Sequence, residues 1–399
     1  MIKNERIKEL AAKLNDYTVE SRRKIHRFAE ISGTEMKTSA FIREEIEKLG
    51  LPYEKLEKTG LVATLDTGRE GKRIALRADI DALPLPENPN NLAGPRVCVS
   101  ENPATCHACG HDAHSAMLLS AMKVLCELKD DLSGIIDFCF EEGEENGGGS
   151  FQMVEALKSR KMDGVWAIHV YAALDSGKIC VEPGPRMAGA VSVDFTVHGK
   201  GGHGSRPDLS INPVYTAAQI LPNLACAFEN QLNVEETVTL GITSIQGGTT
   251  GNVIPETARV LGSFRFFNIE EGKKSVEILK KVCEHTAAMN NCTVTYAPKT
   301  GIAVVPVMTD ATCSELATEA LNEILPEGTV AHCDKWYASE SFSRIAAIFP
   351  SVFAFLGIRN PEYGSGATHH NEYFDVDENV LPIGLLSTVK YVVRFLGEQ

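Results

Sequence analysis

The chain has 399 residues, of which 43% are hydrophobic, and its formal net charge is −14. A chain of this length exceeds the size at which a single hydrophobic core stops growing, so the sequence predicts more than one domain. The acidic balance argues against nucleic acid and anionic membranes as partners.

The first residues, Met1–Arg6, begin a charged stretch without the apolar core of a signal peptide. No apolar run approaches the roughly 20 residues that span a bilayer, so no membrane partner is expected. Eleven cysteines without an export signal indicate reduced thiols, and we expect a cytoplasmic protein.

The first half of the chain alternates between helical and strand patterns. The expected helices are 3–49, the segment after His111 and 150–160, and the expected strands are 61–65, 73–77, 134–140 and 164–168. Because several of these strands are almost wholly apolar, the pattern is typical of an α/β sheet covered by helices on both faces.

From about Gly189 the pattern changes to strictly alternating strands and two long helices. The expected elements are strand 191–197, helix 213–228, two further strands and helix 269–290, before an α/β pattern resumes near Ala303 with strand 351–356 and a helix from Asp377. We therefore expect a mixed-sheet α/β domain formed by residues 1–188 and 304–399, with an inserted α+β domain over 189–303.

Possible metal ligands are densest in the segment Cys106–His114, which contains two thiols, three imidazoles and a carboxylate. Cys and His are preferred by borderline divalent metals. An apolar run follows, so the segment is expected in a turn at the start of a buried helix, where the thiol pKa is lowered. This pattern indicates a metalloenzyme.

Other interpretations of this segment explain less of it. A redox pair of Cys106 and Cys109 leaves the histidines without a role, and Gly110 interrupts the spacing of a c-type haem site. A closed structural zinc site needs a second Cys/His pair nearby, which does not follow. Buried thiols with a helix-capping Asp112 remain the alternative without a metal.

Polar groups also follow four apolar strands. They are Asp79 and Asp81, Glu141 and Glu142, His169, and His369 and His370. Open α/β sheets bind ligands beyond the carboxyl ends of their strands, so we expect these groups in one crevice.

Adjacent residues that leave a strand point in opposite directions, so one of Glu141 and Glu142 can ligate a metal while the other transfers protons. Glu144 and Glu145 are interpreted as part of a solvated acidic loop. No Gly-x-Ser-x-Gly elbow or Walker-type loop is present, which excludes serine hydrolases and nucleotide-driven enzymes.

The inserted domain contains a glycine-rich loop, 197–205, that carries His203. Glycines there permit a close approach of the backbone to a ligand. Asn252 and Arg265 are further polar groups at strand margins. Spacing alone favours a β-turn and ordinary surface charge for these residues.

Seven motifs in this order resemble a known family. They are Arg77–Pro84, His107–His114, Glu141–Gly143, His169, Gly199–Gly204, Asn252–Pro255 and His370–Phe374. Together they are similar to the metal-dependent amidohydrolase branch of the aminoacylase and carboxypeptidase family, which includes hippurate hydrolases and plant hydrolases of indole-acetyl amino acids. The resemblance implies an α/β catalytic domain with an inserted lid domain through which many members dimerise.

The resemblance also implies residue roles. A centre of two divalent ions (zinc, manganese, cobalt or nickel) would be held by Cys109, His111, Glu142, His169 and His370, with Cys109 bridging. Glu141 would be the general base and acid, and Asp81 would orient His111. From the lid, His203 of a partner subunit, Asn252 and Arg265 would reach the substrate.

These implications lead to one expected function. The chain is expected to hydrolyse the amide bond of N-acyl amino acids or related small amides, as a homodimer formed through the lid. The alternative within the same machinery is a dipeptidase or aminoacyl-peptide hydrolase. The alternative of another class is a metal-loaded binding protein, against which the Glu141–Glu142 pair argues, since binding needs no proton transfer.

Overall fold

The computed structural model describes residues 2–397, which separate into two compact units. Unit 1 comprises Met1–Arg186, Met308–Asp334 and Arg344–Gln399, and unit 2 comprises Met187–Val307 and Lys335–Ser343. Each unit has its own sheet, helices and hydrophobic core.

Unit 1 is built on a seven-stranded sheet of order β1-β2-β4-β3-β5-β16-β6. Its strands are β1 (Tyr53–Lys55), β2 (Leu61–Asp66), β3 (Arg73–Asp79), β4 (Ile135–Glu141), β5 (Gly164–Asp175), β6 (Ile179–Cys180) and β16 (Ser351–Arg359). The four central strands are parallel, whereas β1, β2 and β6 pair antiparallel at the two edges. The expected mixed sheet is confirmed, and the carboxyl ends of its central strands meet at one edge.

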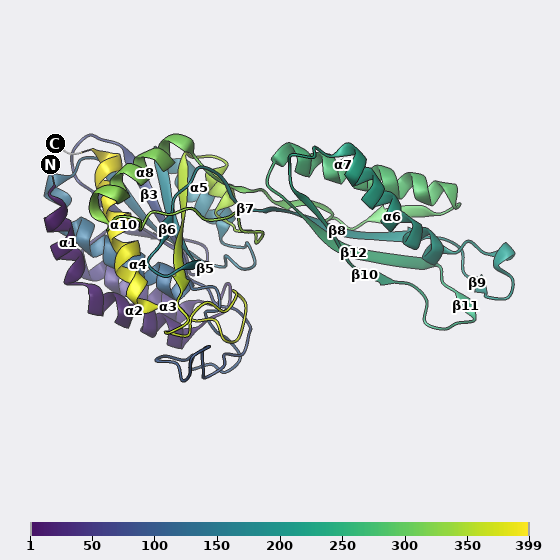
Figure 1. Ribbon diagram of the computed structural model, residues 1–399, viewed down its shortest axis with the longest axis horizontal. Coiled ribbons are helices and arrows are strands. Elements are labelled where there is room, and N and C mark those ends of the chain that lie inside the picture. Colours follow the sequence, from purple (N-terminus) through teal and green to yellow (C-terminus); the bar gives the residue numbers. More distant parts are fainter. Residues whose placement is uncertain (1, 398–399) are drawn as a thin grey trace. The chain divides into compact units, whose positions relative to one another are not determined.

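Helices pack around this sheet. They are α1 (Asn4–Ala12), α2 (Asn15–Phe28), α3 (Met36–Lys48), α4 (His111–Glu127), α5 (Ser150–Arg160), α8 (Ala311–Ile324), α9 (Ser343–Ala346) and α10 (Leu381–Leu396). The buried helix α4 packs on β3 and β5, and both α2 and α10 pack on α4 (Figure 1). Trp166 of β5 stacks on Tyr391 of α10 with ring centroids 4.5 Å apart. The core therefore carries the start of α4 to the edge where the central strands end.

Two expected boundaries in unit 1 are wrong. The segment 3–49 forms three helices because the chain turns after Ala12 and again at Ala29, which has a left-handed φ of 36°. The strand with His169 does not end there, since β5 continues to Asp175 along the parallel strand β16.

One helix, Glu378–Leu396, is long and apolar enough to cross a membrane by length and composition alone. However, 72% of its most apolar window is buried inside the protein. Such burial is typical of a core helix, and α10 packs against α1, α4 and α8.

Unit 2 is an antiparallel sheet of order β10-β12-β8-β13, with β14 also paired to β8. Its strands are β8 (Gly189–His198), β10 (Val238–Gln246), β12 (Thr257–Phe266), β13 (Thr293–Tyr296) and β14 (Gly301–Val304). The helices α6 (Pro213–Gln231) and α7 (Ile269–Met289) lie on one face of this sheet (Figure 1), and the core of unit 2 lies between them and the strands. Strict alternation in β8 therefore reflects one covered face, as predicted.

Shorter strands complete both units. They are β7 (Gly184–Met187), which pairs with β15 (Val307–Thr309), and β9 (Gly202–His203), which pairs with β11 (Val253–Ile254). Unit 2 also includes Lys335–Ser343, which the sequence pattern left in the main domain. The reason is local pairing: the Ala188 N–H lies within hydrogen-bonding distance of the carbonyls of Trp336 and Ala338.

Candidate metal centre

The turn before α4 brings Cys109 and His111 to the strand edge of unit 1. Gly110 has a φ of 89° and its Cα faces β5 so closely that an added Cβ would lie 2.3 Å from Val170 Cγ2. Only glycine adopts this backbone beside β5 without displacing the strand. α4 therefore begins at His111, as the sequence predicted, with Cys109 held just before it.

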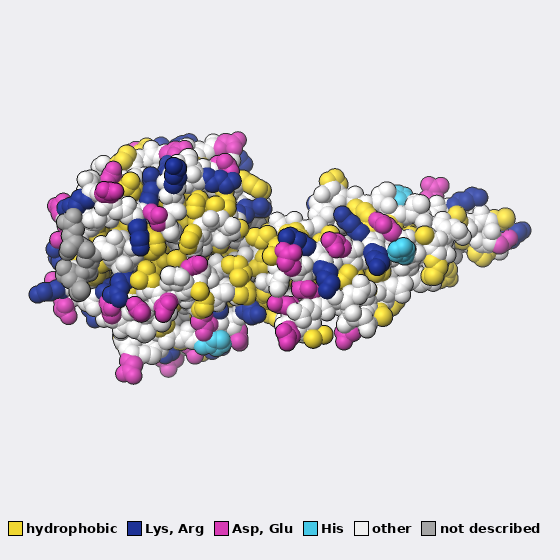
Figure 2. All heavy atoms as spheres, turned by 90° about the horizontal axis from the view of Figure 1, so that it is seen from above, with side chains coloured by type: hydrophobic (Ala, Val, Ile, Leu, Met, Phe, Trp, Pro, Cys, Tyr) yellow, Lys and Arg dark blue, Asp and Glu magenta, His cyan; other side chains and the backbone are white. Residues whose placement is uncertain are grey.

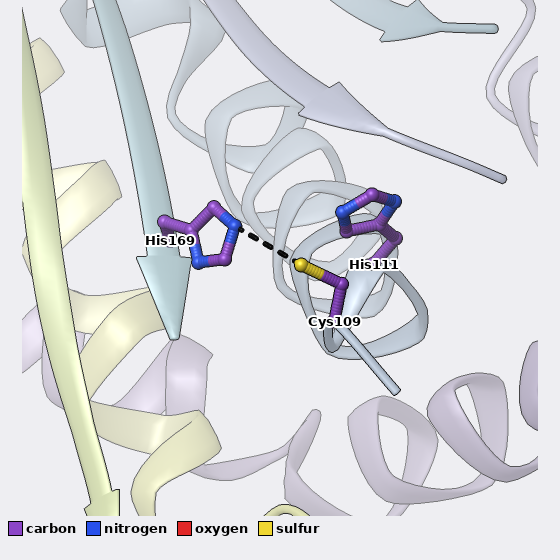
Figure 3. Close-up of side chains that lie close together, drawn as sticks. All are labelled: Cys109, His111 and His169. Atoms are coloured by element: carbon purple, nitrogen blue, oxygen red, sulfur yellow. Dashed lines mark hydrogen bonds between the residues drawn. The ribbon is translucent and has the colours of Figure 1, made fainter. Parts of the chain in front are cut away.

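Cys109, His111 and His169 form a buried cluster (Figure 3). The Cys109 thiol lies 3.7 Å from His169 Nε2, and one ligand atom of each residue lies within 4.8 Å of the others. His169 Nδ1 lies 2.7 Å from the Val170 carbonyl, to which it donates, so Nε2 is left as the acceptor. Burial, followed by the neighbouring His114, holds the pKa of His169 well below its ordinary value, and the ring is neutral, as a metal ligand must be.

A second cluster shares Cys109 with the first and adds Glu145 and His370. His370 Nε2 lies 3.3 Å from Glu145 Oε1, and His111 Nε2 lies 3.9 Å from the same oxygen. His370 is held there by its backbone N–H, which donates to the Ala108 carbonyl at 2.9 Å. Because Cys109 belongs to both groups, and His111 also groups with Glu144 and Glu145, the donor atoms fit two adjacent cation sites.

Asp81 supports both clusters from behind. Its Oδ1 lies 3.1 Å from His111 Nδ1, and its Oδ2 accepts the backbone N–H of Glu145 at 3.0 Å and the Ser32 hydroxyl at 2.6 Å. Burial works to raise the pKa of Asp81, but the hydrogen bonds with His111 and Ser32 outweigh it and lower that pKa. The carboxylate therefore stays ionised and contacts His111, as its predicted orienting role requires.

Glu141 and Glu142, predicted as base and ligand, lie outside the two clusters. Arg77 Nε donates to Glu141 Oε2 at 3.0 Å, and the Thr59 hydroxyl donates to Glu142 Oε2 at 3.0 Å, joined by the N–H groups of Thr59 and Gly60. Within residues 2–397, neither belongs to a group of His, Cys and acidic side chains close enough to hold a metal. The structure instead places Glu144 and Glu145 beside His111.

The cause of this correction is the turn after β4. Gly143 has a φ of 60° and its N–H donates to Glu35 at 2.9 Å, so the chain reverses after the first pair of glutamates and brings the second pair back over the sheet edge. The interpretation of Glu144 and Glu145 as a solvated loop was therefore wrong. The sequence has four glutamates within five residues, and their spacing does not separate the two pairs. The glycine between the pairs is the one sequence signal of a turn there.

The electrostatics of the clusters favour a bound cation. Burial, with Glu145 nearby, raises the pKa of Cys109 well above its ordinary value, which corrects the expected lowering at a helix N-terminus. Burial also disfavours the charged form of His111, but Asp79 and Cys109 raise the pKa of this ring. A site that draws protons onto a buried imidazole has excess negative charge, which a divalent cation neutralises.

Two buried atoms identify the position that a metal would fill. His111 Nε2 and Glu145 Oε1 have no hydrogen-bond partner, although each is shielded from solvent. Buried polar atoms without partners are rare, and His111 and Glu145 each offer a possible ligand atom within 4.8 Å of the Cys109 thiol. The donor set of sulfur, imidazole nitrogen and carboxylate oxygen suits zinc, manganese, cobalt or nickel.

Sequence reasoning missed a buried charge network that holds the two ligand segments together. Asp112, next to His111, accepts from Arg22 Nε at 2.9 Å and lies 2.8 Å from His26 Nδ1. Arg22 also donates to Asp375 at 3.1 Å, in the loop that carries His370. No short motif announces these α2 residues, because their partners lie about 90 to 350 positions away in the chain.

The candidate substrate residues lie in unit 2. His203 on β9 pairs with Val253 on β11, and the Gly204 N–H donates to the Asn252 carbonyl at 2.9 Å, so His203 and Asn252 share one exposed ribbon. Arg265 pairs with Ala190 near the opposite end of β12. The structure thus brings His203 and Asn252 together and leaves Arg265 elsewhere in unit 2.

Comparison with known proteins shows the family of the chain. The model of peptidase family M20/M25/M40 matches residues 75–394. The chain belongs to this family. Among relatives of this M20 family chain, thermostable carboxypeptidase 1 of Saccharolobus solfataricus is 32% identical over 98% of both chains. The N-acetylcysteine deacetylase of Bacillus subtilis is 30% identical over 92% of this chain and 93% of its own length.

A solved structure extends the comparison to the metal centre. A dinuclear metal binding peptidase of the M20 family from Bacillus subtilis superposes with a TM-score of 0.83 at 27% identity, covering 96% of this chain and 99% of that one. The resemblance stated from the motifs is therefore confirmed. This M20 family chain is a metal-dependent amidohydrolase with a site for two divalent ions.

Proposed function

We propose that this chain hydrolyses the amide bond of N-acyl amino acids, with zinc, manganese, cobalt or nickel as the ion pair. The observation that carries the proposal is the pair of ligand clusters that share the Cys109 sulfur beside an ionisable carboxylate, Glu144. The relative named N-acetylcysteine deacetylase supports the acyl amino acid as the substrate class.

The residues of the two clusters and their neighbours would have three different roles. Cys109, His111, Glu145, His169 and His370 would hold the ions, which polarise the scissile carbonyl and make water acidic enough to react near neutral pH. Glu144 would take the proton of the attacking water and pass it to the leaving amine, since its carboxylate lies within 4.8 Å of ligand atoms of His111 and Glu145. Asp81 keeps His111 and the Glu145 backbone in place.

The roles in unit 2 are also part of the proposal. His203 and Asn252 would stabilise the oxyanion that forms at the carbonyl, and Arg265 would bind the carboxylate of the substrate. Within unit 2, Arg265 and Thr257 lie on the same strand, β12, and Thr257 is the end next to the His203 ribbon. The eight residue steps between them correspond to roughly 27 Å, at about 3.4 Å per residue. Because one small substrate cannot span that distance, we propose that His203 acts in a partner subunit.

A homodimer through unit 2 follows from this assignment. Beside the His203 ribbon, Tyr215 and Val253 are 69% and 55% exposed and line a hollow of about 640 Å³. Exposed apolar side chains around a hollow are typical of protein interfaces, and β10 is the strand at one edge of the sheet. On the face drawn in Figure 2, Lys and Arg side chains are scattered among Asp and Glu, which agrees with a small-molecule substrate in place of nucleic acid.

A second candidate function is peptide hydrolysis with the same centre, because a relative with 32% identity is named thermostable carboxypeptidase 1. The two candidates differ in the amino group of the substrate, which is acylated in the first and free in a dipeptide. All eleven cysteines are free thiols, which supports the proposed cytoplasmic location for either function.

One experiment separates these functions. The apoenzyme is reconstituted with each of the four ions and assayed on N-acetyl amino acids and on dipeptides with the same C-terminal residue. Faster turnover of the acetylated compounds is expected. Cleavage of the dipeptides alone would replace the first candidate by the second, and binding without cleavage of either series would indicate a non-catalytic binding protein.

A further inference from the structure

Cys180 and Cys333 form a thiol pair in unit 1 that belongs to neither ligand cluster of the metal centre. Cys180 ends the edge strand β6, and Cys333 lies in the segment that runs beside it. The Ile179 N–H donates to the Thr329 carbonyl, and the Ala331 N–H donates to the Ile179 carbonyl, both at 2.9 Å. Backbone pairing therefore holds the two cysteine segments together.

Two charged side chains bracket the pair. Glu182 Oε2 lies 3.4 Å from Cys180 Sγ and 3.5 Å from the backbone nitrogen of Cys333. Arg186 Nη2 lies 3.5 Å from Cys180 Sγ and also donates to the Cys333 carbonyl. Since each of these atoms contacts both cysteines, the Cys180 sulfur faces the backbone of Cys333.

The two thiols also affect each other's ionisation. The neighbouring Cys333 raises the pKa of Cys180, and Cys180, together with Arg186, lowers the pKa of Cys333. Each thiol donates to an oxygen, Cys180 to Glu182 Oε2 and Cys333 to the Asp334 carbonyl, both at 3.4 Å. Cys333 is the more exposed of the two thiols, at 6% against 1% for Cys180, so it is the one that an oxidant reaches first.

The pair lies just below the surface. The exposed fractions of Cys180 and Cys333 are 1% and 6%, whereas the side chains of His332 and Asp334 on either side of Cys333 are 74% and 97% exposed. A small oxidant is therefore favoured over a bulky protein thiol as the reaction partner.

We propose that Cys180 and Cys333 are a redox-sensitive modification site at which a peroxide forms a disulfide that a dithiol reductant reverses. Cys333 loses its proton and its sulfur attacks one peroxide oxygen, the O–O bond breaks, and a sulfenic acid forms as hydroxide leaves and takes up a proton to become water. Cys180 then attacks the sulfenic sulfur, the S–S bond forms and a second water leaves. The two thiols lose two electrons and two protons, and the peroxide is reduced to two waters.

The position of the pair gives the disulfide a consequence for turnover. The chain passes from unit 1 into unit 2 at two places, after Arg186 and after Asp334. Arg186 contacts both cysteines, and Asp334 directly follows Cys333. A disulfide would restrain both connecting segments. This consequence rests on the proposed function, in which residues of unit 2 act on the substrate.

The disulfide is tested by peptide mapping. The metal-loaded wild type, Cys333→Ser and a matched control, Cys226→Ser, which removes an exposed thiol, are treated with hydrogen peroxide, alkylated and digested without reductant. A peptide joining Cys180 to Cys333 is expected in the wild type and in Cys226→Ser, and it should vanish after dithiothreitol and in Cys333→Ser. Oxidation of Cys226 in the wild type without any such linked peptide would overturn the proposal.

Turnover is measured on the same samples. Oxidised wild type is expected to turn over severalfold more slowly at unchanged metal content and to recover with dithiothreitol. Cys333→Ser treated in the same way is expected to keep its rate. An equal loss in Cys333→Ser would assign the inactivation to another group and refute the consequence. If the untreated enzyme cleaves no acyl amino acid, the proposed function fails, while the linked peptide still decides the modification site.

Discussion

Glu144 and Glu145 illustrate how one turn decides the chemistry of neighbouring residues. Arg77 and the Thr59–Gly60 backbone bind the carboxylates of Glu141 and Glu142, while Gly143 directs the following two toward His111. Protonation of Glu141 would remove one of the two carboxylates, Glu141 and Asp79, that pair with the buried Arg77, and this loss makes Glu141 a poor proton carrier.

Glu144→Gln is expected to keep its metal content but to lose turnover by roughly 10²–10⁴-fold, the range for removal of a general acid–base group. Glu145→Gln is instead expected to lower the metal content, since Glu145 Oε1 lies between His111 and His370. Metal analysis and steady-state kinetics of the purified variants distinguish the two effects.

The matched control is Glu141→Gln, which lies three residues away and pairs with Arg77. It should retain its metals and lose less activity than Glu144→Gln, with its main effect on stability. Were Glu141→Gln the inactive, metal-loaded variant, the proton-transfer role would return to Glu141.

The shared sulfur leads to a second expectation at the residue scale. Cys109→Ser should lose metal and activity together, because a hydroxyl is a weak ligand and Cys109 belongs to both clusters. Cys106→Ser is the control: burial raises the pKa of Cys106 to about 12, so it stays a neutral thiol outside both clusters. Full metal occupancy in Cys109→Ser, measured by elemental analysis, would contradict the shared-ligand assignment.

At the scale of elements, α2 holds the first turn of α4. His26 contacts Asp112 at 2.8 Å through Nδ1 and Glu87 at 2.8 Å through Nε2, beside Arg22 and His107. Burial disfavours the charged ring, but hydrogen bonds with Asp112 and Glu87 outweigh it and raise the pKa of His26 from 6.5 to about 9. The protonated ring therefore stabilises the folded state.

The sign of the pH dependence follows from this raised pKa. Below about pH 6.5 the ring is protonated in both states and the stabilisation is complete, and it is lost as the pH rises from there to about 9. The shift corresponds to roughly 3 kcal/mol of unfolding free energy, as an order of magnitude. Denaturant unfolding of the wild type and His26→Gln across this range should show the difference between them shrinking with pH; a constant difference would contradict the charged His26.

At the scale of the whole molecule, the proposed dimer predicts that two inactive variants complement each other. His203→Ala should lower turnover by roughly 10²-fold or more at unchanged metal content, because it removes an oxyanion donor. Mixed with Glu144→Gln subunits, it should recover some activity, since one site of the heterodimer would combine an intact Glu144 with an intact partner His203.

Subunit exchange must be verified independently, by a mass difference between the two subunits in native mass spectrometry. The control is the pair His203→Ala with Asn252→Ala, which share one ribbon and should not complement as fully, because both lesions lie in the same part of unit 2. Verified exchange without recovery would place His203 in its own subunit's site or outside catalysis.

The sequence by itself determined the fold class and most of the ligand types. Apolar strands between helices can be satisfied only by a covered sheet, and polar residues after those strands must meet at its edge, so the carboxylates and histidines there became candidates for one crevice. The choice of Cys109, His111, His169 and His370 as ligands among them came from the resemblance to the amidohydrolase family. The sheet and the crevice follow from local periodicity and chain direction, both of which are written in the sequence.

Only the tertiary structure decided which glutamates reach the metal centre and what holds it in place. The choice between Glu141–Glu142 and Glu144–Glu145 depends on where Arg77, Thr59 and the Gly143 turn lie in space, and the support of α4 depends on Arg22, far away in the chain. Neither has a local signal, because a carboxylate adjusts to the nearest buried donor or cation, and that neighbour is set by the packing of the whole unit.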